Sequence, residues 1–335
     1  MSNKSRVQTQ VATAGQRLSV GELGQALQQM ASAVQGANAE DSFEKWKKRY
    51  QTEGLEGLKD LPRNKSSHPQ ATSPEVKQMI IELSKRHPGW GCVRLSDYLK
   101  SEKHVSVSSP TVQNILIKEN MGSRHERLLK LQACYLQGEI ELSEEQITLI
   151  EADNPCFRER DLNVSAPGEL LVQDTFYIGN ISGIGKCYLH AVVDIYSSYA
   201  FGFLHTSKKP EPAVAVLHNE VLPVCAEHDI AIQAVMSDSD KEFSGKDTHP
   251  YRVYLMFNDI KHRQLPAKKL ANGYMERFKK TVHDEFKVKG ITVDSFETIQ
   301  NDMANWIEFY NTKRPHEGYP NMGKTPAEVF FGNSR

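Results

Sequence analysis

The hydrophobic pattern of the chain changes at Gly168, and this change constrains the fold more than any other sequence feature. Before Gly168, apolar residues recur every three or four positions, which is typical of amphipathic helices. After it, runs rich in Val, Leu, Ile and Tyr predict strands at residues 169–176, 186–196 and 199–206, with a hairpin turn at 179–185. An all-helical part followed by a part that mixes strands and helices is therefore expected.

Helices and strands alternate in the rest of the C-terminal part. Helical spacing predicts helices at 210–226, 272–287 and 296–310. Short apolar runs predict further strands at 232–236 and 260–262. A hairpin and a third strand, followed by two more strands that alternate with helices, indicate an α/β sandwich, with a mixed five-stranded sheet flanked by helices.

The helical part is predicted to hold two helix-turn-helix units, the second with Val105-Ser106-Val107 as a candidate wing. The first unit has a poorly formed turn around Gly36 and reads as eroded. From the composition and the breaks, the expected parts are a disordered start (1–17), a first helix-turn-helix (18–61), a linker (62–72), a second helix-turn-helix or winged helix (73–125), a helical acidic connector (126–165) and the α/β core (166–335).

Charge is strongly segregated although the formal net charge is only −1. The balance of Lys+Arg against Asp+Glu is 20 to 13 in residues 1–133, 2 to 8 in 134–165, 6 to 11 in 166–258 and 13 to 10 in 259–335. Such asymmetry indicates contact with nucleic acid, although ordinary solvated surface charge would explain it equally well.

Side chains suited to DNA phosphates or base edges occur in both predicted helix-turn-helix units. These are Lys45, Lys47, Lys48 and Arg49 in the first unit, and Thr111, Gln113, Asn114 and Lys118 on the last helix of the second. Each unit alone would also fit an all-helical packing module without a DNA role. Two units in tandem within the basic third of the chain favour double-stranded DNA as a partner.

Several classes of protein are excluded by simple counts. The five cysteines form no C-x-x-C pair, which argues against a disulfide scaffold or a zinc ribbon and for a reducing cytosol. No apolar run approaches the ~20 residues that span a bilayer, and residues 1–16 lack the apolar region of a secretory signal. We therefore expect a cytoplasmic protein with no membrane partner.

Three acids occupy positions that catalysis could use. Asp174 lies inside an apolar strand, where an unpaired charge is costly, and Asp238 directly follows a buried strand. Glu276 lies near the start of a predicted helix. Hard divalent cations prefer oxygen ligands, and two of them can support phosphoryl transfer. Each acid taken singly would also fit a helix cap or an ion pair.

Four motifs in one order give the C-terminal part a family resemblance. They are residues 171–175 (LVQDT), 236–243 (MSDSDKEF), 272–278 (NGYMERF) and 310–316 (YNTKRPH), the last followed by Thr325-Pro326. Residues 166–335 thereby resemble the DDE catalytic core of bacterial insertion-sequence transposases, which are related to retroviral integrases. Residues 43–131 resemble the helix-turn-helix region of such transposases, notably at 54–58 (GLEGL) and 90–95 (WGCVRL).

The resemblance implies a ribonuclease H-like fold, dependence on Mg²⁺ with Mn²⁺ as a substitute, and DNA integration by a homo-oligomer in the bacterial cytoplasm and nucleoid. Retroviral integrases also carry a zinc-binding His/Cys domain, but this chain has no such spacing, so no zinc is predicted. It makes Asp174, Asp238 and Glu276 the catalytic and metal-binding triad. Arg277, Lys279 and Lys280 lie beside Glu276 and become candidate phosphate contacts. His262 is a weaker DNA-contact candidate, with a hydrogen-bonded strand-end histidine as the alternative.

The chain departs from the family pattern at several positions. Ser239 and Asp240 replace the usual Asn-Gly, Lys279 replaces a common Asn, and the Pro that often precedes Asn272-Gly273 is missing. The main hypothesis is an active transposase that cleaves the 3′ ends of a mobile element and transfers them to target DNA. The alternative is a degenerate, catalytically weak or inactive copy that acts as a sequence-specific DNA-binding protein. Ribonuclease H activity on the same fold is a third possibility.

Overall fold

The computed structural model describes residues 48, 51–52, 72–181, 183–265, 272–286 and 296–332. The chain divides into two compact units, Met1–Thr72 and Ser73–Arg335. The predicted disordered start, the first helix-turn-helix with Lys45, Lys47 and Arg49, and nearly all of the linker lie outside the described residues. Lys48 is described, and it is helical and exposed.

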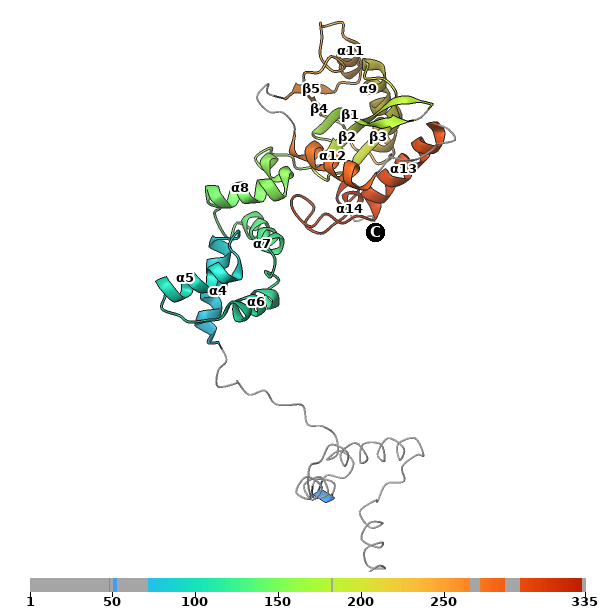
Figure 1. Cartoon of the computed structure of the whole chain (residues 1–335). Coiled ribbons are helices and arrows are strands. Elements are labelled where there is room, and N and C mark those ends of the chain that lie inside the picture. The colour runs from blue at the N-terminus through green and yellow to red at the C-terminus, as the bar shows by residue number, and fades with distance from the viewer. Residues whose placement is uncertain are drawn as a thin grey trace, which may run out of the picture. The chain divides into compact units, whose positions relative to one another are not determined.

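Five helices open the second unit (Figure 1). They are α4 (Pro74–Arg86), α5 (Cys92–Glu102), α6 (Ser109–Lys118), α7 (Arg124–Leu136) and α8 (Glu144–Asp153). Ser73 and Ser108 cap α4 and α6, and each is followed closely by a proline. Helices α4, α5 and α6 share a core that includes Ile80, Leu95 and Leu116.

The predicted wing is not formed at Val105-Ser106-Val107. These residues are irregular, and no strand pairs with them among the described residues. Ser96 donates its hydroxyl hydrogen bond to the carbonyl of Val107, which fastens this segment to α5. The segment therefore serves as a short connection that packs on the helices.

A mixed five-stranded sheet follows, with the order β3-β2-β1-β4-β5. The strands are β1 (Leu171–Ile181), β2 (Gly185–Asp194), β3 (Ala200–His205), β4 (Ala234–Ser237) and β5 (Lys261–Gln264). The first three form an antiparallel meander, whereas β4 runs parallel to β1 and β5 parallel to β4. This arrangement confirms the predicted ribonuclease H-like fold, a mixed sheet flanked by helices and preceded by a helical region.

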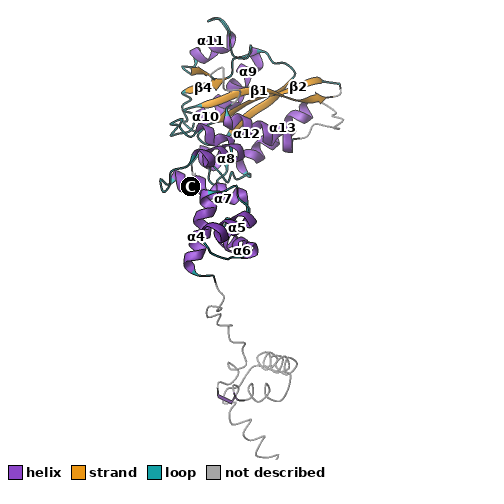
Figure 2. Ribbon diagram, turned by 60° about the vertical axis from the view of Figure 1, so that its left-hand side comes forward, coloured by secondary structure: helices purple, strands orange, loops and turns teal. Residues whose placement is uncertain are grey.

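Helices cover both faces of the sheet (Figures 1 and 2). One face packs on α9 (Pro210–Val216), η3 (Leu217–Val221), α10 (Leu222–Glu227) and α11 (Pro250–Phe257), and the other on α12 (Gly273–Glu285) and α13 (Phe296–Thr312). Alternate strand residues serve the two cores: Leu171 and Val192 face the first set of helices, and Val172 and Val193 the second. The last helix among the described residues is the short α14 (Pro326–Phe330).

The structure differs from the sequence expectations in several elements. The predicted helix at 210–226 is interrupted by the π-helical turn η3, and α11 and α14 were not predicted. Gly168, where the hydrophobic pattern changes, has φ of 82°, and a Cβ there would lie 2.6 Å from the carbonyl oxygen of Ala231. Both facts require glycine at this position. None of the described helices is long and apolar enough to cross a membrane.

Candidate active site

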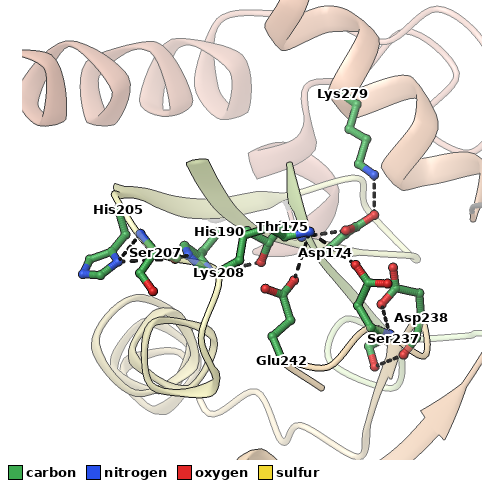
Figure 3. A network of polar contacts seen from close by, with 11 residues as sticks. Asp174, Thr175, His190, His205, Ser207, Lys208, Ser237, Asp238, Glu242 and Lys279 are labelled. Carbon is green, nitrogen blue, oxygen red and sulfur yellow. Dashed lines mark hydrogen bonds and ion pairs between the residues drawn. The ribbon is translucent and has the colours of Figure 1, made fainter. Parts of the chain in front are cut away.

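The strand pair β1 and β4 brings Asp174 and Asp238 together. Leu171 is paired with Val235, and Val172 with Met236. Asp174 lies two residues after Val172, and Asp238 two residues after Met236, so the two aspartates lie at the same level of the sheet. Figure 3 shows their side chains as neighbours. Partial burial raises the pKa of Asp238, and the nearby carboxylates of Asp174 and Asp240 raise it further. The strand register thus creates a concentrated negative charge at the carboxyl end of β4.

Asp174 is paired with a lysine of the neighbouring helix. Its Oδ2 accepts a charge-assisted hydrogen bond from the Lys279 ammonium, while Oδ1 accepts a 2.6 Å bond from the backbone N–H of Thr175 (Figure 3). Lys279 lies three residues after Glu276, one turn along α12. Lys279, a predicted DNA-contact residue, therefore forms an ion pair with Asp174, a predicted metal ligand.

Glu276 lies in the first turn of α12, which begins after the Asn272 cap; the Asn272 side chain accepts a 2.9 Å bond from the N–H of Tyr274. The Glu276 carboxylate accepts bonds from both terminal nitrogens of Arg158, at 2.6 and 3.3 Å. Arg158 belongs to η2 (Pro155–Glu159), a 3₁₀ turn at the end of the acidic connector. The ion pair with Arg158 therefore links Glu276 to the acidic connector.

A second lysine stands among the acids. The Lys208 ammonium lies 3.3 Å from Oδ2 of Asp240 and 3.9 Å from Oε1 of Glu242. The Glu242 side chain is only 1% exposed, and burial raises its pKa to about 7 although the nearby charge of Lys208 lowers it. Burial lowers the pKa of Lys208, but the surrounding carboxylates more than compensate, so this pKa is raised. We call Asp174, Asp238, Asp240 and Glu242 the carboxylate cluster.

The donor set of the site fits a hard divalent cation in part. Asp174 and Asp238 offer neighbouring carboxylate oxygens, the ligand type that Mg²⁺ prefers. Glu276 faces Arg158, and among the described residues no three His, Cys, Asp or Glu side chains gather closely enough to hold a metal ion together. The two strand aspartates are thus positioned as a pair, whereas Glu276 would have to exchange its arginine partner to join them.

The predicted phosphate contacts on α12 have different surroundings. Lys280 is exposed. Arg277 turns inward, where its guanidinium lies 3.4 Å from the carbonyl oxygen of Tyr319 and 3.9 Å from the Cys156 sulfur. His262 on β5 donates to the hydroxyl of Ser237 at 2.8 Å, beside Asp238, which agrees with the alternative of a hydrogen-bonded strand-end histidine.

The predicted contacts on α6 also divide into two kinds. Asn114 and Lys118 are exposed. The Thr111 hydroxyl lies 2.9 Å from that of the capping residue Ser108. The Gln113 amide accepts from the Cys92 thiol at 2.6 Å and donates to the carbonyl of Gly122 at 3.3 Å. Of the four predicted contact residues, Thr111 and Gln113 therefore form hydrogen bonds within the helical region, whereas Asn114 and Lys118 are exposed.

Three site residues were missed from the sequence. Arg158 is one of only two basic residues in the acidic stretch 134–165, a weak signal that its charge has a specific partner. Glu242 lies within the 236–243 motif, but no spacing rule distinguishes it from a surface acid. Lys208 lies in the loop after β3, where only tertiary packing brings it to the carboxylate cluster.

Two stretches of the chain match protein-family models. Residues 42–116 match the Homeodomain-like domain, and residues 260–326 match the Integrase core domain. The second stretch contains β5, α12 and α13, and therefore both Glu276 and Lys279.

Solved structures with similarity to this chain include three retroviral integrases. The HTLV-2 integrase catalytic core domain in complex with magnesium, in its trimeric form, is 14% identical with a TM-score of 0.37, over 49% of this chain and 97% of that one. The integrase of a simian T-cell lymphotropic virus intasome in complex with PP2A regulatory subunit B56 gamma is 13% identical with a TM-score of 0.37, over 61% and 74%. The catalytic core domain of BIV integrase is 13% identical with a TM-score of 0.37, over 49% and 93%.

Proposed function

We propose that this chain, a protein of the transposase and integrase type from the retroviral integrase superfamily, binds the ends of a mobile DNA element, cleaves their 3′ ends and joins them to target DNA. We further propose that it works as a homo-oligomer on DNA. Its N-terminal helical region would supply the contacts with the element ends, and Asn114 and Lys118 on α6 have the exposure that such contacts need.

The observation that carries this proposal is the register of β1 and β4. It sets the carboxylates of Asp174 and Asp238 side by side, and α12 begins on the same domain with Glu276 in its first turn. Burying two like charges together costs free energy unless a cation or a proton compensates. Such an arrangement favours a function that recruits cations over a purely structural role.

Asp174 and Asp238 would hold the metal, with Glu276 as the third ligand after exchange from Arg158. A divalent metal ion, when bound, would polarise the scissile phosphate and help to activate the attacking oxygen. The side chains that the ion releases, Lys279 and Arg158, would then be free to contact DNA phosphates. Both cleavage and joining would proceed as in-line phosphoryl transfers without a covalent protein intermediate.

The test is a nicking and joining assay on the cognate element ends with Mg²⁺ and Mn²⁺. Asp174→Asn, Asp238→Asn and Glu276→Gln should each reduce strand transfer at least about 100-fold, because each removes a metal-binding charge, while end binding stays largely intact. The matched control is Asp247→Asn, since Asp247 is 96% exposed and pairs only with the surface residue Arg252 among the described residues. Joining at the wild-type rate by all three variants would refute the proposal.

The ion pair of Lys279 with Asp174 favours a second candidate function, a DNA-binding protein with weak or no catalysis. An ammonium held on a ligand carboxylate competes with a metal ion for that oxygen. In this case the chain would occupy the element ends and regulate them, with salt-sensitive binding and no cleavage that depends on Mg²⁺.

Lys279→Asn separates the two candidates. If the lysine only moderates metal binding, this variant should reach half of its maximal cleavage at an Mg²⁺ concentration about threefold lower than wild type, because the competing ion pair is worth about 0.5–1 kcal/mol. If the protein is a binding module, both proteins should bind ends and neither should cleave. An RNA–DNA hybrid in the same assay tests for ribonuclease H activity.

A further inference from the structure

Arg158 holds Glu276 through two hydrogen bonds from a segment that lies outside the α/β core sequence. The Nη1–Oε2 and Nη2–Oε1 distances are 2.6 and 3.3 Å, the fork geometry in which an arginine binds a carboxylate with both nitrogens. Both side chains are partly exposed, at 34% for Arg158 and 43% for Glu276. The pair is therefore accessible to exchange with ions from solvent.

The segment that carries Arg158 is firmly anchored on the helices before it. Phe157 is fully buried in a cluster with Leu128, Leu131 and Ile150, which come from α7 and α8. Arg160 forms a 2.7 Å ion pair with Glu151 of α8 and lies over the Phe157 ring. The position of Arg158 is consequently set by the packing of the connector helices.

The same segment also touches the start of α12. The Glu159 carboxylate accepts a 3.2 Å bond from the N–H of Gly273, and a Cβ on Gly273 would lie 2.0 Å from the Pro155 carbonyl oxygen. The backbones of η2 and α12 are therefore in close contact three residues before Glu276. This contact leaves the Glu276 side chain, rather than the helix, as the part that can move.

We infer that Arg158 is a positioning residue that competes with a divalent cation for the Glu276 carboxylate, and so couples metal loading to the connector helices. The inference rests on the proposed function, in which Glu276 is the third metal ligand. It assigns a specific task to the connector. Binding of a metal ion to Glu276 would release the Arg158 guanidinium. Because the coupling is reciprocal, a partner that binds Arg158 in its released position would strengthen metal binding by the factor by which the metal strengthens the binding of that partner.

The competition has a measurable size. A partly exposed ion pair contributes about 0.2–1 kcal/mol, and a two-pronged arginine lies at the upper end of that range. Removing the guanidinium should therefore tighten metal binding about three- to fivefold. A much larger factor would require a buried pair, which the exposure of these side chains excludes.

The experiment measures Mn²⁺ binding to the full chain without DNA, by the electron paramagnetic resonance signal of free Mn²⁺. Arg158→Gln should bind Mn²⁺ about three- to fivefold more tightly than wild type, and Arg158→Lys, which keeps a single-pronged pair, should lie between the two. Arg314→Gln is the matched control, because Arg314 makes a 2.7 Å pair with Glu285 on the same helix at a similar exposure of 33%. It removes the same charge without freeing Glu276, so its Mn²⁺ affinity should stay at the wild-type value.

A double-variant cycle excludes a general charge effect. In a Glu276→Gln background, Arg158→Gln should leave Mn²⁺ affinity unchanged, since the carboxylate for which it competes is gone. Unchanged affinity of a folded Arg158→Gln protein, or equal tightening by Arg314→Gln, overturns the inference. If Asp174→Asn and Asp238→Asn weaken Mn²⁺ binding in that same case, the proposed metal site stands and only the role of Arg158 fails. If neither weakens it, the metal site fails and the inference fails with it.

Discussion

Three basic side chains in the candidate site each lie against a carboxylate. Lys279 pairs with Asp174, Lys208 with Asp240 and Glu242, and Arg158 with Glu276. Lys279 and Lys208 offset the repulsion among the acids of the carboxylate cluster, and Arg158 neutralises the charge of Glu276. These pairs also explain how the site combines high charge density with a stable fold, because the two lysines place positive charge where the acids would otherwise repel one another.

A buried histidine next to the site makes a prediction about pH. His190 is fully buried, with Nδ1 accepting from the Thr175 hydroxyl and Nε2 donating to the Ser207 carbonyl, both at 2.9 Å. Burial lowers the pKa of His190 to about 4 from an ordinary value of 6.5. The folded state thus binds fewer protons than the unfolded state between these values, and its stability falls as the pH drops from 6.5 towards 4.

His190→Gln should remove this part of the acid sensitivity. The wild type should be the more stable protein at pH 7, and its advantage over the variant should shrink by about 1–2 kcal/mol at pH 5. Urea unfolding of both proteins at the two pH values measures the change. A stability difference that stays constant between pH 7 and pH 5 would show that His190 does not titrate in this range.

Among the elements, the contact of η2 with α12 explains a local sequence pattern. Asn272 caps the helix, and Gly273 is required because the Pro155 carbonyl oxygen occupies the space of a side chain. The Asn-Gly pair therefore combines a helix start with a packing site. An element of the acidic connector therefore shapes the position of Glu276.

Gly273→Ala should destabilise the second unit. A methyl group 2.0 Å from a backbone oxygen forces η2 and α12 apart, at a cost of at least about 2 kcal/mol. The midpoint of thermal unfolding, followed by circular dichroism, should fall by about 4–8 °C. Gly91→Ala is the control, because no heavy atom lies within 4 Å of its added Cβ, and it should unfold within about 2 °C of wild type. Equal midpoints for the two variants would contradict the tight packing.

On the scale of the whole molecule, the boundary between the two compact units falls within the basic N-terminal third of the chain. The boundary between units falls after Thr72, and ten of the 41 Lys and Arg residues precede it. The match to the Homeodomain-like domain begins before this boundary and ends after it, at residue 116. Full binding of DNA ends should therefore need residues from both units.

Residues 73–335 expressed alone should fold, but their affinity for element ends should depend less steeply on the salt concentration than that of the full chain. Because this part has its own cores, its thermal midpoint should lie within about 3 °C of the main transition of the full chain. The slope of the logarithm of affinity against the logarithm of salt concentration should become shallower by about 0.9 for each DNA phosphate that residues 1–72 neutralise in the full chain. Fluorescence anisotropy on labelled ends measures it, and identical slopes would exclude residues 1–72 from DNA binding.

Local pattern alone identified much of this protein. The change at Gly168 and the five strands followed from side-chain periodicity and turn chemistry, which act over a few residues. Local pattern also marked Asp174, Asp238 and Glu276 as candidates, because an acid in or beside an apolar element is conspicuous, and their role as a catalytic triad stays a prediction from the family resemblance. The helix α11 was not predicted because its eight residues, PYRVYLMF, span little more than two turns and are mostly apolar, so no helical period stands out.

Only the tertiary structure decided which charges meet. Glu276 follows Arg158 by 118 positions, and Lys279 follows Asp174 by 105, so no local pattern can indicate these pairs. The inward turn of Arg277 and the internal use of Gln113 likewise depend on which element packs against them. The pattern of apolar and acidic residues along the sequence determined the fold and the candidate acids. Long-range packing determined the partner of each acid, because ion pairs form through space between elements that the fold brings together.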